Sequence, residues 1–349
     1  MLRGAVAGIA VVAVLAVSGA SGSSAAPASP CDDPRVGLLA PLTGGASFIG
    51  KEQLALARHA MRTVVDREVR LVEGDTQLDP SRAVGAFRGL VRRPNVLAVI
   101  GPAGSQEVVA VARTLPARER LAFVSASAVQ PELTNGAIRT FFRVVPSASA
   151  QAPTVARLLA RRLGAARVAV VDDRSSYARR LADRVQARLR AAGAAVDRTA
   201  VDARATDFTA AAARIPAGTE AVFLAFHVAA TAQLFAEALR GRGLEVPLVG
   251  SDTLDSGDFT VSGAYVTAFA PRVRVPGYAR RPTKFGAPAY VAAEVALRAV
   301  RAACADGKAT REEVLGRIRA TDLRTVLGRI RFTRRGDVRG ASYAVFRLP

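Results

Sequence analysis

The chain has 349 residues, of which half are apolar and only 5% aromatic, so its length fits two domains rather than one core. Its formal net charge is +20, yet nearly all of the basic residues are arginines, scattered in pairs with no basic block and no interleaved aromatics. This distribution favours a general bias in composition over a surface for nucleic acid or another anionic partner.

The first 26 residues are typical of a secretory signal peptide. Arg3 supplies a positive start, Gly4–Val17 is uncharged and apolar, and Ser24–Ala26 offers a small-residue cleavage site. The apolar run is shorter than the about 20 residues that a membrane-spanning helix needs. We therefore expect an extracytoplasmic protein, secreted or associated with the cell surface, with an uncleaved membrane anchor as the alternative.

The chain has two cysteines, Cys31 and Cys304. Two cysteines in an exported chain can form a disulfide. Cys31 also follows the signal peptide closely, but Pro30 and Ala28 stand where a lipoprotein has a small residue and a leucine-like residue. A Cys31–Cys304 disulfide is the expectation, with a lipidated Cys31 or two unpaired cysteines as the alternatives.

Strand-like apolar runs alternate with helical patterns in the first part of the mature chain. Strands are predicted at Val36–Ala40, Val69–Glu73, Leu97–Gly101 and Leu121–Ser125, and helices at Gly50–Val65, Pro80–Arg92 and Ser105–Leu115. Apolar strands between helices are typical of a parallel sheet that is covered on both faces. The sequence therefore predicts an α/β unit here.

A second α/β unit begins near Ser149. Its predicted helices are Ser149–Leu163, Tyr177–Ala192, Phe208–Ile215 and Ala230–Arg240, and its strands are Arg167–Val171, Ala195–Val201, Ala221–Ala225 and Pro247–Gly250. The tail adds a strand at Ala264–Phe269, a loop at Pro271–Pro282, and helices at Ala287–Ala305 and Thr310–Ala320. A strand pair, Gly328–Phe332 with Ser342–Phe346, is predicted to close the chain.

Glycine-containing loops join two of these strands to the helices that follow. After Val36–Ala40 come Pro41, Thr43 and two glycines, and the stretch 96–113 repeats this layout with Ser105 at the helix start. Such loops direct backbone N–H groups and a helix N-terminus toward an anion. The pattern predicts a cleft for a small ligand that carries a carboxylate-like group.

Five short segments, in this order, resemble those of substrate-binding proteins of branched-chain amino acid ABC importers: Ala40–Gly44, Ile100–Ser105, Val124–Thr134, Phe142–Pro146 and Asp172–Tyr177. The resemblance covers about residues 35–347. It implies a type I periplasmic-binding-protein fold, with two Rossmann-like lobes joined by a three-strand hinge. Lobe one would hold residues 32–143 and 271–325, and lobe two would hold residues 147–270 and 328–349.

The resemblance also implies a ligand site in lobe one. Ser105 would bind the ligand carboxylate through its hydroxyl and N–H, and Ser127 would accept from the ligand ammonium through its backbone carbonyl. The family usually has a threonine where Val129 stands, so Val129 offers only its N–H. Ile49 stands where an aromatic residue often covers the ligand, and Phe48 is the candidate substitute.

In lobe two the resemblance places Tyr177 at the mouth of the cleft and Asp252 against the ligand ammonium. His227 lies near a position where the family has a tyrosine, and a histidine there would make binding pH-dependent. Each of these residues has a plainer structural alternative: a helix cap, a packed side chain or a solvated loop.

The expected function is that of an extracytoplasmic solute-binding protein. It would capture a small carboxylated or zwitterionic, amino-acid-like solute by hinge closure and deliver it to an ABC permease. We expect a monomer with no cofactor, metal or nucleic acid. A ligand-sensing protein that reports to a membrane receptor or kinase is the alternative. An enzyme is not expected, because Ser105 lacks a GxSxG elbow and the two histidines, His59 and His227, form no metal-binding cluster.

Overall fold

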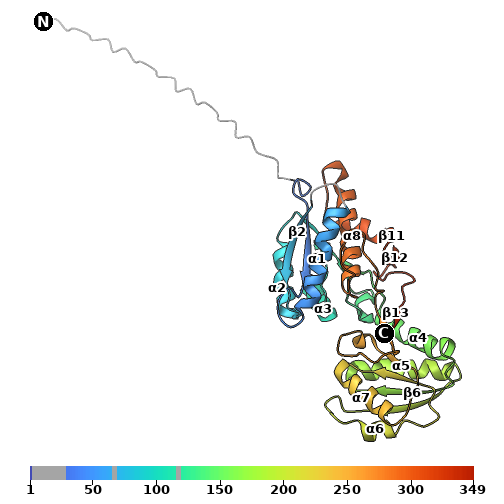
Figure 1. Cartoon of the computed structure of the whole chain (residues 1–349). Helices are drawn as coiled ribbons and strands as arrows, with labels where there is room; N and C mark the ends of the chain where they lie inside the picture. Colours follow the sequence, from blue (N-terminus) through green and yellow to red (C-terminus); the bar gives the residue numbers. More distant parts are fainter. Residues whose placement is uncertain (2–28, 65–68, 115–118) are drawn as a thin grey trace.

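The computed structural model describes residues 1, 29–64, 69–114 and 119–349. Apart from Met1, the predicted signal peptide (1–26) lies outside the described residues. Figure 1 shows two lobes, one above the other. Among the described residues, no helix combines the length and apolarity needed to cross a membrane.

The first lobe is built on a five-stranded parallel sheet in the order β2-β1-β3-β4-β5. These strands are β1 Arg35–Ala40, β2 Arg70–Asp75, β3 Val96–Ile100, β4 Ala122–Ser125 and β5 Phe141–Arg143. One face carries α1 (Ser47–Thr63), α8 (Gly286–Ala303) and α9 (Arg311–Arg319), and the other carries α2 (Pro80–Val91) and α3 (Ser105–Thr114). The short helices η2 (Pro131–Thr134) and η6 (Cys304–Asp306) complete this lobe.

The second lobe is built on a six-stranded sheet in the order β13-β10-β9-β8-β6-β7. Its strands are β6 Arg167–Asp172, β7 Ala195–Ala200, β8 Ala221–Ala225, β9 Leu248–Gly250, β10 Tyr265–Ala268 and β13 Ala344–Arg347, with only β13 antiparallel. One face carries η3 (Ala148–Ala150), α4 (Gln151–Arg157), η4 (Leu158–Arg162) and α5 (Ser176–Ala191), and the other carries α6 (Thr209–Ala213) and α7 (Ala229–Gly241). The short helix η5 (Asp252–Leu254) follows β9.

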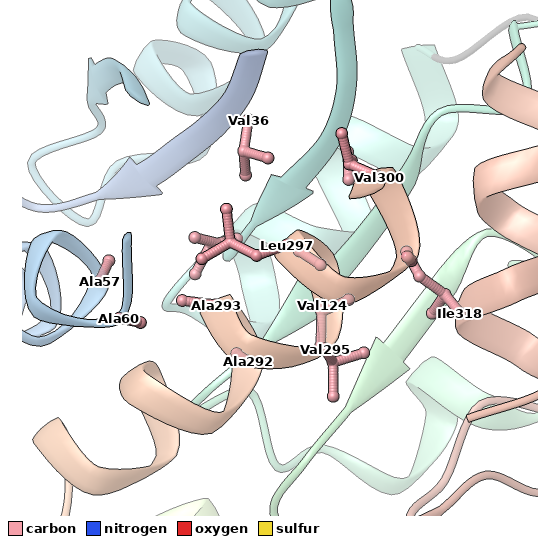
Figure 2. Close-up of a cluster of buried hydrophobic side chains, with 14 of the residues drawn as sticks. Val36, Ala57, Ala60, Val124, Ala292, Ala293, Val295, Leu297, Val300 and Ile318 are labelled. Atoms are coloured by element: carbon pink, nitrogen blue, oxygen red, sulfur yellow. The ribbon is translucent and has the colours of Figure 1, made fainter. Parts of the chain in front are cut away.

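The core of the first lobe depends on small residues between α1 and α8. Figure 2 shows Ala57 and Ala60 of α1 beside Ala293 of α8, while Leu297 of α8 lies below Val36 of β1. The three alanine side chains are fully buried. Because the distance between packed helices depends on the side chains at their contact, this alanine seam lets α1 and α8 lie close together on the sheet.

A disulfide joins Cys31 to Cys304, whose Cα atoms are 5.5 Å apart. It ties the chain before β1 to the end of α8, across 273 residues of sequence. The Cys31 sulfur is thus already bonded, which agrees with the expected pairing and leaves no thiol at this position to carry a lipid.

The predicted closing strand pair is wrong. Strand β12 (Gly328–Arg331) pairs with β11 (Asp322–Thr325), whereas β13 pairs with β10 of the second sheet. The cause is apolar burial, because Ile330 and Phe332 join the core of the first lobe and the Phe332 ring lies 5.0 Å from that of Phe142. Residues 328–332 therefore pack on the first lobe, and only the last strand packs in the second.

Three crossovers join the lobes, and all of them meet the carboxyl edges of the sheets. The first follows the end of β5 and the second follows the end of β10. The third contains Asp337, which forms an isolated parallel β-bridge with Arg143, and it ends at Ala344, the first residue of β13, which pairs with Ala268 at the end of β10. The crossovers pack on one another through an apolar hinge cluster consisting of Val145, Phe269, Ala270 and Tyr343. The carboxyl edges of both sheets thus face the same junction.

Candidate functional site

In parallel α/β sheets, ligands bind outside the carboxyl ends of the strands. All six ligand-binding residues predicted from the sequence lie just beyond such ends. Ser105 follows β3, Ser127 and Val129 follow β4, Tyr177 follows β6, His227 follows β8, and Asp252 follows β9. The junction between the lobes is therefore the candidate site.

On the first lobe, the N-terminus of α3 is held in place by its neighbours. Glu107 accepts a hydrogen bond from the N–H of Gly104 (2.5 Å), a side-chain cap of the helix start. Ser105 Oγ accepts from the N–H of Gln130 (3.2 Å), which leaves the hydroxyl proton of Ser105 for another acceptor. The first N–H groups of a helix have no intrahelical acceptor. This helix start can therefore receive a carboxylate.

The loop after β4 lies beside this helix start. Ser127 Oγ donates to the carbonyl of Ala103 (2.8 Å) and accepts from Gln53 Nε2 (2.9 Å). The hydroxyl is thus engaged in the lobe, so any contact of Ser127 with a ligand falls to its backbone. Val129 packs against the hinge cluster, and its carbonyl accepts from the N–H of Ala148 in the first crossover (2.8 Å).

Arg143, which the sequence analysis did not select, holds the loop after β4 in place. Its guanidinium is fully buried and donates to Asp337 Oδ1 (2.6 Å), the carbonyl of Gln130 (2.6 Å) and Thr134 Oγ1 (2.8 Å). Gly336 makes the ion pair possible, because its φ of +91° brings the chain so close to β5 that a Cβ would lie 2.0 Å from the carbonyl oxygen of Phe141. The sequence offered one sign of this role, because Arg143 is a charged residue within the otherwise apolar run 141–145.

On the second lobe, Asp252 and Tyr177 form a polar group with Gln151, another residue that sequence reasoning missed. Asp252 Oδ1 accepts from the Tyr177 hydroxyl (2.5 Å) and from Gln151 Nε2 (2.9 Å). This oxygen of Asp252 is therefore engaged by two donors of the protein itself. Asp252 Oδ2 accepts no hydrogen bond from any described residue and remains available to a cation.

Burial and the negative charge of Asp252 raise the pKa of the Tyr177 phenol well above its ordinary value. Tyr177 therefore stays protonated and donates to Asp252 at neutral pH. Gln151 is itself buried and also donates to Thr267 Oγ1 (3.1 Å), so two anchored donors orient the carboxylate.

Lys284, on the second crossover, holds the backbone of Asp252. Its Nζ donates to the carbonyls of Asp252 (2.7 Å) and Asp255 (3.0 Å), and so stabilises the turn of η5. Burial lowers the pKa of Lys284, while the charges of Asp255 and Asp252 oppose this effect. Its ammonium contacts the backbone at both ends of this turn and lies 3.9 Å from the carboxylate of Asp255, so Lys284 positions Asp252 without occupying its free oxygen.

The two histidines lie in different surroundings. His227 is exposed at the rim of the second-lobe edge, and its ring lies 5.9 Å from that of Tyr177. Its backbone N–H donates to the carboxylate of Asp173 (2.6 Å). His59 is buried in α1, and its Nε2 lies 2.8 Å from the carbonyl oxygen of Pro276. No group of three or more possible metal ligands occurs among the described residues.

Phe48, the expected cover for a ligand, is 66% exposed at the start of α1. Its ring lies 6.2 Å from that of Phe285, which lies 5.5 Å from that of Phe269 in the hinge cluster. A row of three aromatic rings therefore runs from α1 of the first lobe to the second crossover.

The six predicted residues form two groups, one for each lobe. Ser105, Ser127 and Val129 share one loop network, while Tyr177, His227 and Asp252 lie together on the second lobe. The groups are connected where the first crossover enters the second lobe: Ala148 donates to the carbonyl of Val129, and Gln151 at the start of α4 donates to Asp252. Hydrogen-bond donors thus line one edge, and a carboxylate marks the other.

The fold and this site define a two-lobed α/β binding protein with the type I periplasmic-binding fold. Residues 34–349 match the model of the family described as "Periplasmic binding protein", and the chain belongs to this family of solute-binding proteins, which are not enzymes.

Known proteins agree with this assignment. The chain is 27% identical to the Leu/Ile/Val-binding protein BraC3 of Rhizobium johnstonii over 66% of its own length and 64% of that protein's, just under two thirds. It is 24% identical to a leucine-, isoleucine-, valine-, threonine- and alanine-binding protein of Pseudomonas aeruginosa over 90% of each chain. The crystal structure of a leucine-binding protein of Thermotoga maritima, 24% identical, superimposes with a TM-score of 0.72 over 90% of this chain and 95% of that one.

Proposed function

We propose that this protein is the extracytoplasmic solute-binding component of an ABC importer and that its solute is a zwitterionic, amino-acid-like molecule. One observation carries the proposal. A free carboxylate oxygen of Asp252 lies at one carboxyl edge, and the N-terminus of α3 with Ser105 lies at the other, on either side of the crossovers. A molecule with an ammonium and a carboxylate group has the charges that these two edges accept.

Binding would act by population shift. A solute that contacts both edges is bound more tightly when the lobes are close together, so it favours the closed form. The helix start supplies partial positive charge for the carboxylate, while Asp252 supplies a full negative charge for the ammonium. No bond is made or broken in this process, and the closed complex is what a permease would recognise.

The disulfide and the family support the proposed location, because disulfides persist in oxidising compartments outside the cytoplasm. The names of the relatives support branched-chain amino acids as first probes. Valine in place of the usual threonine at position 129 keeps other carboxylated solutes among the candidates.

The test pairs an amino acid with the 2-keto acid of the same side chain. A thermal-shift screen first selects the amino acid that binds most tightly, since a ligand at about 100 times its Kd stabilises the folded state by about 2.7 kcal/mol. Calorimetry then compares the wild type with Asp252→Ala. We expect amino-acid binding to weaken by about 2–4 kcal/mol, because the ligand ammonium loses its buried partner charge, and keto-acid binding to change little.

Asp258→Ala, in an exposed loop of the same lobe, is the matched control and should leave both affinities unchanged. Equal losses for the amino acid and the keto acid would remove Asp252 from ammonium recognition. Unchanged uptake of the solute after deletion of the protein would contradict the transport role and leave the binding role intact.

A further inference from the structure

The two helical layers of the second sheet differ strongly in charge. The layer formed by α4, η4 and α5 carries eight arginines and one aspartate, hence a net charge of +7. The layer on the opposite face, α6 and α7, carries one glutamate and one arginine and is neutral. A uniform bias toward arginine in the composition would charge both layers, so it does not account for the first one.

We call these eight residues the arginine face: Arg157, Arg161, Arg162, Arg179, Arg180, Arg184, Arg188 and Arg190. All eight are exposed. Among the described residues, none of the eight guanidinium groups takes part in an ion pair, and the only acidic residue of the layer, Asp183, lies 3.4 Å from Arg198. Arg162 lies over the ring of Tyr265 (5.7 Å) and Arg190 donates to the carbonyl of Val196 (3.4 Å), but neither contact neutralises a charge, so the arginine face presents its positive charge to solvent.

The start of α5 shows a local conflict that the packing of the protein does not require. A helix N-terminus disfavours cations, yet Arg179 and Arg180 stand in the first turns of α5 and no acidic residue stands in its first turn. Positions that break a local rule of stability often serve function. Arg180, Arg184 and Arg188 follow one another at four-residue spacing and so lie on one side of the helix.

We propose that the arginine face binds the surface of an anionic phospholipid bilayer and so keeps the protein beside its membrane. Guanidinium groups pair well with phosphate, and clusters of basic side chains are attracted to anionic headgroups. The apolar sides of α4 and α5 are buried against the sheet, so the contact is electrostatic and involves no insertion. Because Cys31 forms a disulfide, it does not carry a lipid anchor. Attraction between the arginine face and anionic lipids would hold the protein at the membrane instead.

The experiment measures cosedimentation of the full chain with vesicles of phosphatidylcholine and phosphatidylglycerol in equal parts, and with vesicles of phosphatidylcholine alone. The face variant combines Arg161→Gln, Arg180→Gln, Arg184→Gln and Arg188→Gln. The control variant combines Arg62→Gln, Arg82→Gln, Arg88→Gln and Arg113→Gln, four exposed residues of α1, α2 and α3. Both variants have the same net charge, and circular dichroism with a thermal melt of each protein confirms that both are folded.

We expect the wild type and the control to bind the anionic vesicles, less tightly as salt rises. The face variant, which lacks four of these charges, should bind about 1,000-fold more weakly. Equal losses in both variants would show that net charge alone drives the attraction and would overturn the proposal. No binding by the wild type, or a face variant that binds vesicles normally and loses only its contact with a protein partner, would overturn it as well. The readout does not depend on the identity of the solute.

Discussion

The two carboxyl edges that meet at the junction are built from different chemistry. The first-lobe edge, around Ser105 and Val129, offers backbone N–H groups, the hydroxyl of Ser105 and a helix dipole. The second-lobe edge offers the carboxylate of Asp252, oriented by Tyr177 and Gln151. Dipoles recognise an anion without burying a counter-charge, whereas an ammonium is best met by a carboxylate whose other partners are fixed.

The edges also differ in what holds them. The first depends on an ion pair between the fully buried Arg143 and Asp337 of the third crossover, whereas the second depends on Gln151 at the start of α4 and on Lys284 of the second crossover. Arg143 supports its edge without contacting Ser105, Ser127 or Val129, whereas Gln151 bonds the carboxylate of Asp252 directly. Perturbing the first edge should mainly cost stability, and perturbing the second should mainly cost affinity.

Arg143→Met should produce the largest effect. The substitution leaves the carbonyl of Gln130 and the hydroxyl of Thr134 without their donor and Asp337 without its partner, so we expect the free energy of unfolding to fall by about 3 kcal/mol. Urea denaturation measures this value. The free energy of unfolding of Arg143→Lys should lie between those of the wild type and Arg143→Met. Arg139→Met, at an exposed neighbouring position, should be about as stable as the wild type. A stable Arg143→Met with reduced affinity would reverse the assigned roles of the edges.

Gln151→Leu tests the second edge. Leucine fills similar volume but donates no hydrogen bond to Asp252, and hydrogen bonds to charged groups contribute about 1.5–3 kcal/mol. We expect solute affinity to fall by about 1–2 kcal/mol with little change in the melting temperature. Calorimetry and a thermal melt measure the two quantities, with Gln186→Leu on α5 as the control. A large drop in melting temperature with normal affinity would make Gln151 a structural residue only.

Local sequence patterns predicted part of these two edges, and contacts between residues distant in the sequence explain what was missed. Strand–glycine–helix order placed Ser105 correctly because a parallel α/β sheet brings all of its carboxyl ends to one edge. Gln151, Lys284 and Arg143 were missed because their roles depend on partners 101, 32 and 194 residues away, which no local pattern encodes. The closing strands were mispaired because the alternation of apolar residues predicts a strand but not its partner.

Glu107→Gln examines the first edge by pH. Burial raises the pKa of Glu107, against the hydrogen bonds of Thr76 and Gly104. Between the ordinary and the raised pKa, the native state holds more protons than the unfolded chain, so wild-type stability falls as pH rises through this window. The variant lacks this contribution, and its free energy of unfolding should fall less there. Urea denaturation at several pH values gives the change of the free energy of unfolding with pH for each protein. The same pH dependence in both would contradict a raised pKa of Glu107.

Val129→Thr should produce the smallest effect, in the direction of tighter binding. Threonine has nearly the shape of valine and adds a hydroxyl next to the helix start, so a solute carboxylate could gain one hydrogen bond, worth about 0.5–1.5 kcal/mol. Calorimetry with the screened amino acid measures the gain, and Val109→Thr in the middle of α3 controls for the substitution itself. Because Val129 also packs against the hinge cluster, a loss of affinity would mean that its methyl groups serve the crossovers more than the ligand. In that case valine at this position would adjust the hinge, and the anion-binding edge would consist of Ser105 and the start of α3 alone.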